Sequence, residues 1–357
     1  MKLLLVILSL VVAPFAAADS DSTTKPKQAS PVRFKVANDV ELPAQLRAAR
    51  DIRWYGDSSV VLAAGRPGLF EFFPATGKSN VLVPGTGPGS FFFAARVASS
   101  DGRLLVASVF RSLAVKTSQG VTRPFPFELI VDADISGDRI AILGATRART
   151  GEWNPEGGVV WLGKLEADGT VTDLRPLIVS EERGDRDPVN RCHYLELGAL
   201  RFLSDGSLLV APGLVPGVFL YGSNGRLIKT WETEGRGFED RCRLSDAEHL
   251  TFVKEPLPRF EWINEHTVVD DVLILPSGPA LVLRAIDGQQ TKWSLLHLLP
   301  DGNVRAEPLP LSSRSTFAHV RGDVRGKTIA FVVLEYGLSP DAPPPAPPRV
   351  VLVEVAK

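Results

Sequence analysis

Acidic residues recur at one position of a pattern that repeats along this 357-residue chain. Each repeat is an apolar run, a short turn and a second apolar run, and the acidic residue stands near the start of the first run. Carboxylates that meet in this way could hold a hard cation such as calcium, or act as general bases if crowding raises their pKa values. The candidate ligand-binding residues at this position are Asp51, Asp132, Asp134, Glu196, Asp270, Asp271 and His319.

A metal site is one use of these carboxylates, and its ligands would be Asp51, Asp132 and Asp270. The alternative is structural, because acidic residues at strand ends and turns commonly point to water or pair with arginine. The arginines that could pair with them are Arg50, Arg96 and Arg201. We therefore expect no cofactor, with calcium as the one ion that the residue types would suit.

The repeats predict the elements that position these residues. Six hairpin-like segments are present, and a second pair of alternating runs follows most of them. In Gly217 to Gly235 this second pair surrounds Ser-Asn-Gly, which is a strong hairpin signal. A four-stranded unit with connections of variable length is therefore predicted. The turns of the six hairpins lie near Asp57, Asp101, Gly137, Asp205, Ser277 and Gly326.

On these features the chain resembles the six-bladed β-propeller superfamily. The segment VFLYGSNGRLIKTW, Val218 to Trp231, resembles the outer strands of propellers of the NHL type. We predict an all-β fold in which residues 31–357 form a single domain of six four-stranded antiparallel blades. The last unit is one strand short, so the segment Pro31 to Asp39 should join the last blade and close the ring. The proline-rich stretch before the final strand is interpreted as a surface loop, with a polyproline ligand as the alternative.

Loops from every blade converge at the axial end where the inner strands begin, so we expect the site there. The segment INEHTVVDD, Ile263 to Asp271, adds Asn264 and His266 to the acidic candidates at this end. A long charged connection, Glu181 to Tyr194, is predicted on the same face, and the segment Gly235 to Cys242 joins it there if Cys192 and Cys242 pair. Connections of this length are often binding loops, although a solvated charged loop is the simpler interpretation.

The N-terminus predicts export. Lys2 precedes an apolar core from Leu3 to Val12, and three alanines precede Asp19, as in a cleaved secretory signal peptide over residues 1–18. The core is too short to span a bilayer, which needs roughly 20 residues. We expect a flexible polar segment over 19–30, no transmembrane segment, and a periplasmic or extracellular protein.

The chain has two cysteines, Cys192 and Cys242. An exported protein passes through an oxidising compartment, so we expect a disulfide between them. The alternative is a pair of free or catalytic thiols. Neither a Cys-x-x-Cys motif nor a zinc-ligand spacing accompanies them.

Charge and motifs narrow the function. The formal net charge is −1 and no basic face is visible, so nucleic acid is not an expected partner. The sequence contains no nucleophile elbow and no phosphate loop, which leaves catalytic residues unassigned and the enzyme question open. We expect a monomer.

Two hypotheses remain, and the first is preferred. It makes the protein an exported binding or scaffolding module that engages a protein, peptide or carbohydrate through loops at one axial face. The second rests on resemblance to calcium-dependent lactonase and strictosidine-synthase-like six-bladed enzymes, which implies acidic axial residues that act on an ester or lactone. The chain departs from that pattern, because a full Glu, Asn and Asp ligand set does not align to it.

Overall fold

The computed structural model of the chain describes most of the predicted domain. The described residues are 33–85, 94–108, 112–118, 120–126, 129–145, 158–179, 198–214, 217–235, 245, 247–248, 251, 256–336 and 345–356. By its contacts the segment Val32–Lys357 is one unit. The predicted signal peptide and polar segment lie outside the described residues and stay predictions.

Six four-stranded antiparallel sheets make up the described part of the chain. Blades 1 and 2 contain β2 (Asp51–Trp54), β3 (Val60–Ala63), β4 (Gly68–Phe73), β5 (Lys78–Pro84), and β6 (Ala94–Ser100), β7 (Arg103–Ser108), β8 (Ser112–Thr117), β9 (Gly120–Pro126). Blades 3 and 4 contain β10 (Leu129–Ser136), β11 (Arg139–Ala145), β12 (Gly158–Leu165), β13 (Val171–Val179), and β14 (Gly198–Phe202), β15 (Leu208–Pro212), β16 (Val218–Tyr221), β17 (Leu227–Trp231).

Blade 5 contains β18 (Val268–Leu275), β19 (Gly278–Asp287), β20 (Gln290–Leu298) and β21 (Val304–Ser313). Blade 6 contains β22 (Ala318–Arg325), β23 (Thr328–Glu335), β24 (Arg349–Ala356) and β1 (Arg33–Glu41). The short helix η1 (Ala44–Leu46) follows β1, and α3 (Pro256–Asn264) precedes β18. No helix among the described residues is long and apolar enough to cross a membrane.

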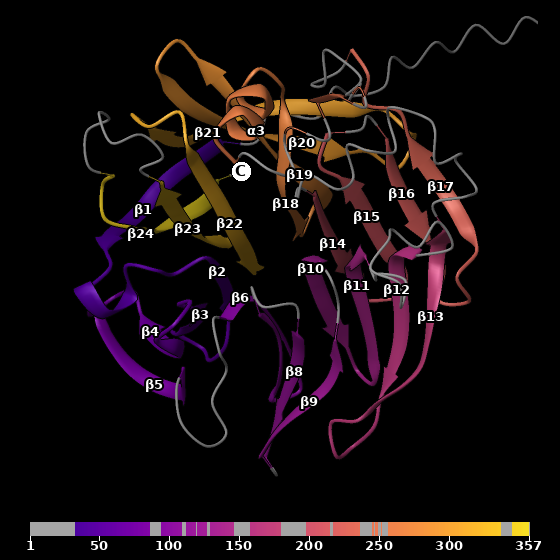
Figure 1. Ribbon diagram of the computed structural model, residues 1–357. Coiled ribbons are helices and arrows are strands. Elements are labelled where there is room, and N and C mark those ends of the chain that lie inside the picture. The colour runs from indigo at the N-terminus through magenta and orange to yellow at the C-terminus, as the bar shows by residue number, and fades with distance from the viewer. Residues whose placement is uncertain are drawn as a thin grey trace, which may run out of the picture. The chain divides into compact units, whose positions relative to one another are not determined.

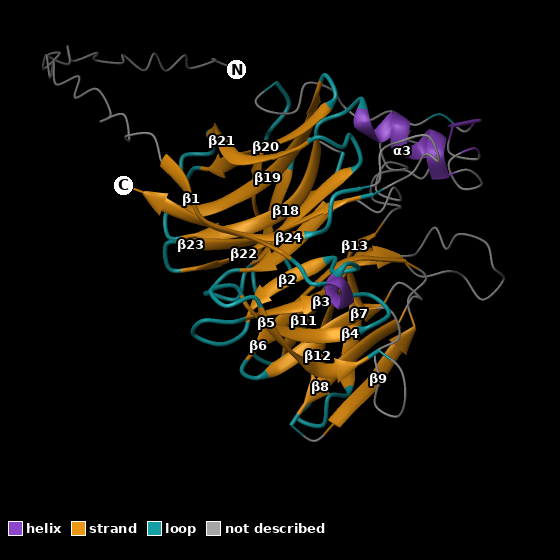
Figure 2. Ribbon diagram, turned by 90° about the vertical axis from the view of Figure 1, so that its left-hand side faces the viewer, coloured by secondary structure: helices purple, strands orange, loops and turns teal. Residues whose placement is uncertain are grey.

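The first strand of each blade lines a common axis. These inner strands are β2, β6, β10, β14, β18 and β22, each of which contacts the next, and β22 contacts β2. The ring of blades is seen in Figure 1, where the chain colour advances from blade to blade. Figure 2 shows the strands from the side, with α3 at one end of the blades. The predicted six-bladed propeller is therefore confirmed.

Blade 6 joins the two ends of the described chain. β1 pairs antiparallel with β24, in a register that runs from Arg33↔Ala356 to Glu41↔Arg349. An ion pair between Arg349 and Asp39 reinforces this seam. The prediction that the N-terminal strand completes the last blade is thus confirmed, because β1 supplies the fourth strand of the sheet.

Turns reverse the chain at all six positions that the sequence indicates. Between β14 and β15, Gly206 has a φ of +78°, a conformation that suits glycine. The Asp205 carboxylate accepts a 2.9 Å hydrogen bond from the Ser207 backbone N–H, which fixes the same turn. These turns place the inner-strand starts at one axial end and the hairpin tips at the other.

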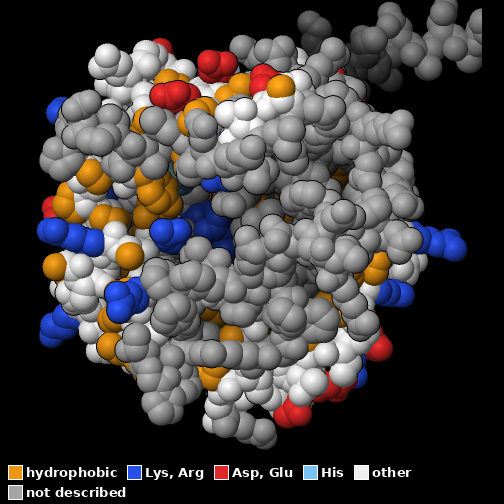
Figure 3. Space-filling model, in the orientation of Figure 1, with side chains coloured by type: hydrophobic (Ala, Val, Ile, Leu, Met, Phe, Trp, Pro, Cys, Tyr) orange, Lys and Arg blue, Asp and Glu red, His pale blue; other side chains and the backbone are white. Residues whose placement is uncertain are grey.

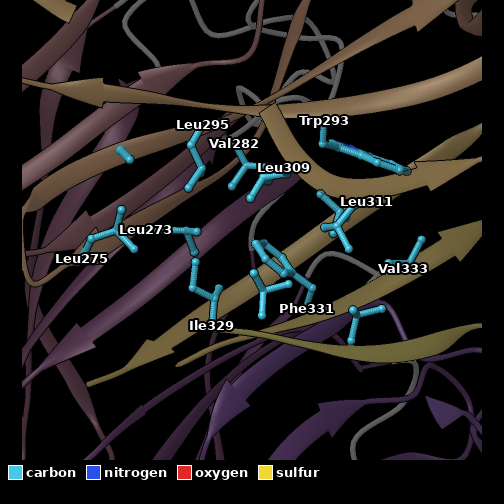
Figure 4. Packing of buried hydrophobic residues seen from close by; sticks show 14 of the residues in the cluster. Leu273, Leu275, Val282, Trp293, Leu295, Leu309, Leu311, Ile329, Phe331 and Val333 are labelled. Atoms are coloured by element: carbon cyan, nitrogen blue, oxygen red, sulfur yellow. The ribbon is translucent and has the colours of Figure 1, made fainter. Parts of the chain in front are cut away.

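The core lies between blades rather than in one central cluster. Successive residues of a strand point to opposite faces of a sheet, so each blade packs against both neighbours. On β3, Leu62 packs in the cluster between blades 6 and 1, whereas Val61 packs in the cluster between blades 1 and 2. Figure 4 shows the cluster between blades 5 and 6, where Phe331 and Trp293 lie among aliphatic side chains. Six such clusters fill the six gaps of the ring.

Gly322 on β22 makes room for the ring of Phe331, since a Cβ built at Gly322 would lie 2.6 Å from Phe331 Cδ1. We expect Gly322→Ala to lower the free energy of unfolding by about 1–3 kcal/mol through overpacking. Phe331→Leu in that background should recover part of the loss, because the smaller side chain vacates the space. Urea denaturation of the two single variants and the double variant measures this coupling. Strictly additive effects would contradict the close contact.

Candidate functional site

The acidic candidates lie on inner strands, as the sequence predicts. Asp51 begins β2, Asp132 and Asp134 lie in β10, and Asp270 and Asp271 lie in β18. All five carboxylates are buried. Burial of a carboxylate demands compensating donors, so the donors decide what these residues do.

Backbone N–H groups of the neighbouring blade are the first of these donors. In each case the carboxylate of one inner strand accepts a hydrogen bond from the inner strand that follows around the ring. The pairs are Asp51 with Val97 (2.8 Å), Asp132 with Leu200 (3.0 Å), Asp134 with Phe202 (2.8 Å), Asp270 with Val320 (3.1 Å), Asp271 with Gly322 (2.8 Å) and Asp323 with Trp54 (2.8 Å). These bonds fasten adjacent blades at the axis.

Arginines are the second set of donors, and they alternate with aspartates around the ring. We call the six residues the axial charge ring, in blade order Asp51, Arg96, Asp132, Arg201, Asp271 and Arg321. Arg201 bridges its neighbours, with Nη1 2.7 Å from Asp132 Oδ2 and Nη2 2.6 Å from Asp271 Oδ1. Arg321 Nη1 lies 3.6 Å from Asp271 Oδ1. The structural alternative that pairs these acids with arginine therefore holds for Arg201.

The arginines of the ring keep Asp132 ionised. Although burial opposes ionisation, Arg201 and Arg321 hold the pKa of Asp132 at about 2. Burial likewise acts against Arg201, yet Asp132 and Asp271 raise the pKa of Arg201 well above its ordinary value. Asp134 differs, because burial raises its pKa to about 6. Asp134 therefore titrates closer to neutral pH than an ordinary aspartate does.

The proposed metal ligands do not fit calcium. Asp51 accepts hydrogen bonds from Arg53 and from two backbone N–H groups, and Asp132 accepts them from Arg201 and Leu200. A cationic guanidinium against each carboxylate repels a second cation. In the described ranges, no group of three or more His, Cys, Asp or Glu side chains is arranged to hold a metal ion.

A second cluster lies where β18 and β22 begin, and we call it the axial mouth. It consists of Asn264, Asp270, Arg284, His319 and Tyr336. Arg284 Nε lies 3.3 Å from Asp270 Oδ1, and Arg284 Nη1 donates to Asn264 Oδ1 at 3.2 Å. The ring of Tyr336 stands edge-on to the ring of His319 with centroids 5.6 Å apart. His319 is 23% exposed, whereas Asp270 and Arg284 are buried beneath it.

Asp270 fixes the protonation state of His319. Burial opposes ionisation of Asp270, but Arg284 and His319 hold its pKa at about 2, so the carboxylate can only accept hydrogen bonds. His319 Nδ1, 3.3 Å from Asp270 Oδ1, must then carry the proton. Burial and Arg284 lower the pKa of His319. A neutral ring with a proton on Nδ1 leaves Nε2 as a hydrogen-bond acceptor.

His266, the other histidine predicted at this end, contacts α3, the helix that precedes it. Its Nδ1 lies 2.9 Å from the carbonyl oxygen of Trp262, and the two rings are 4.2 Å apart. Asn264 does join the axial mouth through Arg284. The segment INEHTVVDD therefore delivers Asn264 and Asp270 to the mouth, while His266 packs on α3.

Some predicted residues lie outside the described part of the chain, and some residues of the site were not predicted. Glu196, Cys192 and Cys242 lie outside the described residues, as do most of the two charged connections, so these predictions stay open. Sequence reasoning missed Arg284, Arg321 and Tyr336. The alternation of acid and arginine at one position of six inner strands is a signal that could have found Arg321, whereas Arg284 and Tyr336 lie outside the inner strands.

The face that carries α3 is hollowed near its centre. Figure 3 shows Lys and Arg side chains gathered in this hollow, with few acidic groups beside them. Arg96 is the partly exposed arginine of the axial charge ring, and burial and Arg321 lower its pKa to about 10. The described surface at this point therefore presents positive charge.

The comparisons with known proteins agree with this architecture. No family model matches the chain, and no curated protein matches it. Among solved structures, the fold is similar to a member of the duf4221 family from Bacteroides vulgatus, with a TM-score of 0.58 and 10% identity over 91% of this chain and 98% of that one. It is also similar to a calcium-binding protein, regucalcin, from Agrobacterium tumefaciens, with a TM-score of 0.50 and 12% identity over 90% and 95% of the two chains.

Virginiamycin B lyase from Staphylococcus aureus aligns with a TM-score of 0.46 and 11% identity over 91% of this chain and 100% of that one. At identities this low the likeness shows the fold alone. The chain is a six-bladed β-propeller.

Arg201 pairs with two buried carboxylates, so its removal should lower the stability of the fold. We expect Arg201→Gln to lower the free energy of unfolding by about 3–5 kcal/mol, because Asp132 and Asp271 would lose their shared cation. Lys164→Gln is the matched control, since Lys164 and Glu166 form an exposed pair at 3.1 Å, and exposed ion pairs contribute little to stability. Urea denaturation of both variants at pH 7 measures the contrast. Equal small effects would show that the ring does not hold the blades.

Asp134 should give stability an unusual pH dependence. Its pKa is about 6 in the folded protein and near 3.8 in the unfolded chain, so the unfolded state loses this proton first as pH rises. Its contribution is present below about pH 4 and is lost by about pH 6, at a cost of about 3 kcal/mol at most. Asp134→Asn should abolish that loss, because the amide keeps an acceptor for the Phe202 N–H. Unfolding curves of both proteins from pH 4 to pH 7.5 provide the measurement; parallel pH profiles would contradict it.

Proposed function

We propose that this propeller is an exported binding module whose ligand, a protein, peptide or carbohydrate, is engaged at the axial face where the inner strands begin. Export itself rests on the N-terminal sequence. The proposal concerns binding, and it assigns no reaction to the protein.

One observation supports the proposal most directly: polar side chains at the axial mouth remain partly exposed after the propeller has closed. The carboxylates of the axial charge ring are committed to arginines and backbone donors, so they serve closure of the propeller. At the mouth, by contrast, His319, Tyr336 and Asn264 are partly exposed. Binding sites typically combine a concave surface with a few placed polar groups, and Figure 3 shows a hollow with Lys and Arg side chains near the centre of the face that carries α3.

The alternative, a calcium-dependent hydrolase, has less support. It requires several free carboxylate oxygens together at the axis. Among the described residues of the ring, only Asp132 Oδ1 lacks a hydrogen-bond partner, and the other carboxylate oxygens accept from arginine or backbone N–H groups. Regucalcin, which is described as calcium-binding, shares the fold at 12% identity, and this likeness carries no ligand set to the present chain.

A second concave surface exists at the opposite end, and it provides a control. A cleft of about 640 Å³ between blades 3 and 4 is lined by Arg139, Lys164 and Arg175, among others. Its rim belongs to hairpin tips and outer strands, away from the inner-strand starts. A variant in this cleft alters a charged recess without touching the axial mouth.

The binding proposal predicts which variants lose a ligand. The purified full chain is screened against a glycan array and a peptide array, and each hit is titrated by calorimetry. We expect Tyr336→Ala to weaken binding about ten-fold or more, because an aromatic hydrogen-bonding contact is removed, while Arg175→Ala leaves the affinity unchanged. Circular dichroism confirms that both variants fold. If Arg175→Ala abolished binding and Tyr336→Ala preserved it, the ligand would bind at the cleft between blades 3 and 4. That result would contradict the proposal.

A further inference from the structure

One buried guanidinium at the axial mouth is incompletely paired. Arg284 is 2% exposed. Its Nη1 donates to Asn264, and its Nε lies 3.3 Å from Asp270 without hydrogen-bond geometry, but among the described residues its Nη2 has no hydrogen-bond partner. Buried arginine N–H groups are almost always paired, because an unmade bond to a charged group is costly. The site thus calls for an acceptor that the described residues do not supply.

Asp270 cannot be that acceptor. Its Oδ2 already receives Trp293 Nε1 at 2.8 Å and the Val320 N–H at 3.1 Å. Its Oδ1 faces both His319 and Arg284. The carboxylate therefore has its donors in place, and the remaining Arg284 nitrogen points to a further oxygen from outside the chain.

Tyr336 supplies a second donor at the axial mouth. Its ring stands edge-on to the ring of His319, and His319 shares the Asp270 Oδ1 atom with Arg284. Because Tyr336 is partly exposed, a ligand group that enters from solvent can reach it.

The charges at the mouth favour a ligand of low charge. Arg284 and Asp270 neutralise each other, and burial and Arg284 lower the pKa of His319 and keep it neutral. The mouth therefore holds no surplus positive charge that would balance a phosphate dianion. A carboxylate is a planar monoanion whose two oxygens can accept from a guanidinium and a hydroxyl together.

We propose that the axial mouth binds a carboxylate group, with Arg284 Nη2 and the Tyr336 hydroxyl as its donors. This inference rests on the proposed binding function of the same mouth and names the chemistry of the ligand. The carboxylate oxygens complete the pairing of Arg284, and His319 Nε2 accepts a hydrogen bond from a neighbouring hydroxyl or amide of the ligand.

Acetate and acetamide form a matched pair for the test, since they share a shape and differ in charge. Carbon-13 acetate is titrated against the full chain by NMR, and acetamide and inorganic phosphate are titrated in parallel. We expect saturable binding of acetate, with acetamide and phosphate each at least ten-fold weaker. Equal binding of acetamide, stronger binding of phosphate, or no acetate binding would overturn the proposal.

Two variants locate the bound acetate. Arg284→Lys keeps the positive charge beside Asp270 and removes Nη2, and Tyr336→Phe removes only the hydroxyl from a partly exposed ring. Each should weaken acetate binding about ten-fold, whereas Arg175→Lys at the opposite end should not change it. Tyr336→Phe keeps the test decisive if Arg284→Lys fails to fold. Unchanged acetate affinity in Tyr336→Phe would overturn the proposal.

The two proposals fail in different ways. If the arrays yield no ligand but acetate binds through Tyr336, the binding function as stated fails and the carboxylate subsite stands. If an array ligand binds and is lost with Tyr336→Ala, while acetate and acetamide bind equally, the subsite fails and the binding function stands.

Discussion

The structure depends on hydrogen bonds that pass from one inner strand to the next. An inner strand is the free edge of its blade, so its outward N–H groups have no ladder partner and would be buried unpaired at the axis. Aspartates of the preceding blade accept these bonds, as Asp51 does from Val97 and Asp271 does from Gly322. Because such a carboxylate carries a charge into a buried place, an arginine must accompany it. Alternation of acid and base around the ring satisfies both demands at once.

The residues that close the propeller at its axis are therefore distinct from those of the proposed binding site. The axial charge ring uses Asp51 and Asp132, which were the proposed metal ligands, and Arg201 and Arg321 keep the pKa of Asp132 low. The binding site that we propose lies beside the ring, at the start of β18. A β-bulge between Val269 and Asp271 lies where β18 carries two successive aspartates. Asp271 belongs to the axial charge ring, whereas Asp270 pairs with Arg284 and His319 at the axial mouth.

Sequence patterns predicted the architecture well because the propeller is built from local units. The turn at Asp205 and Gly206 and the hairpin around Asn224 depend on residues within a few positions of each other. Even closure could be inferred, since a last blade with three strands lacks a partner that β1 can supply. The candidate site was predicted less completely. Asp270 and His319 were named from their position at strand starts, but Arg284 lies on the second strand of its blade, and Tyr336 follows β23.

The sequence by itself determined the repeat, the hairpin turns, the number of blades and the gathering of acids near the axis, because these follow from residue order and side-chain alternation. Only the tertiary structure decided what the acids do. Asp132 and Arg201 are far apart in the chain and come within 2.7 Å only when blades 3 and 4 meet. The strength of a charge interaction depends on distance and burial, and neither quantity is contained in a single strand. For the same reason, the tertiary fold alone turned a set of metal-like carboxylates into a structural ring and left an arginine with an unpaired nitrogen at the mouth.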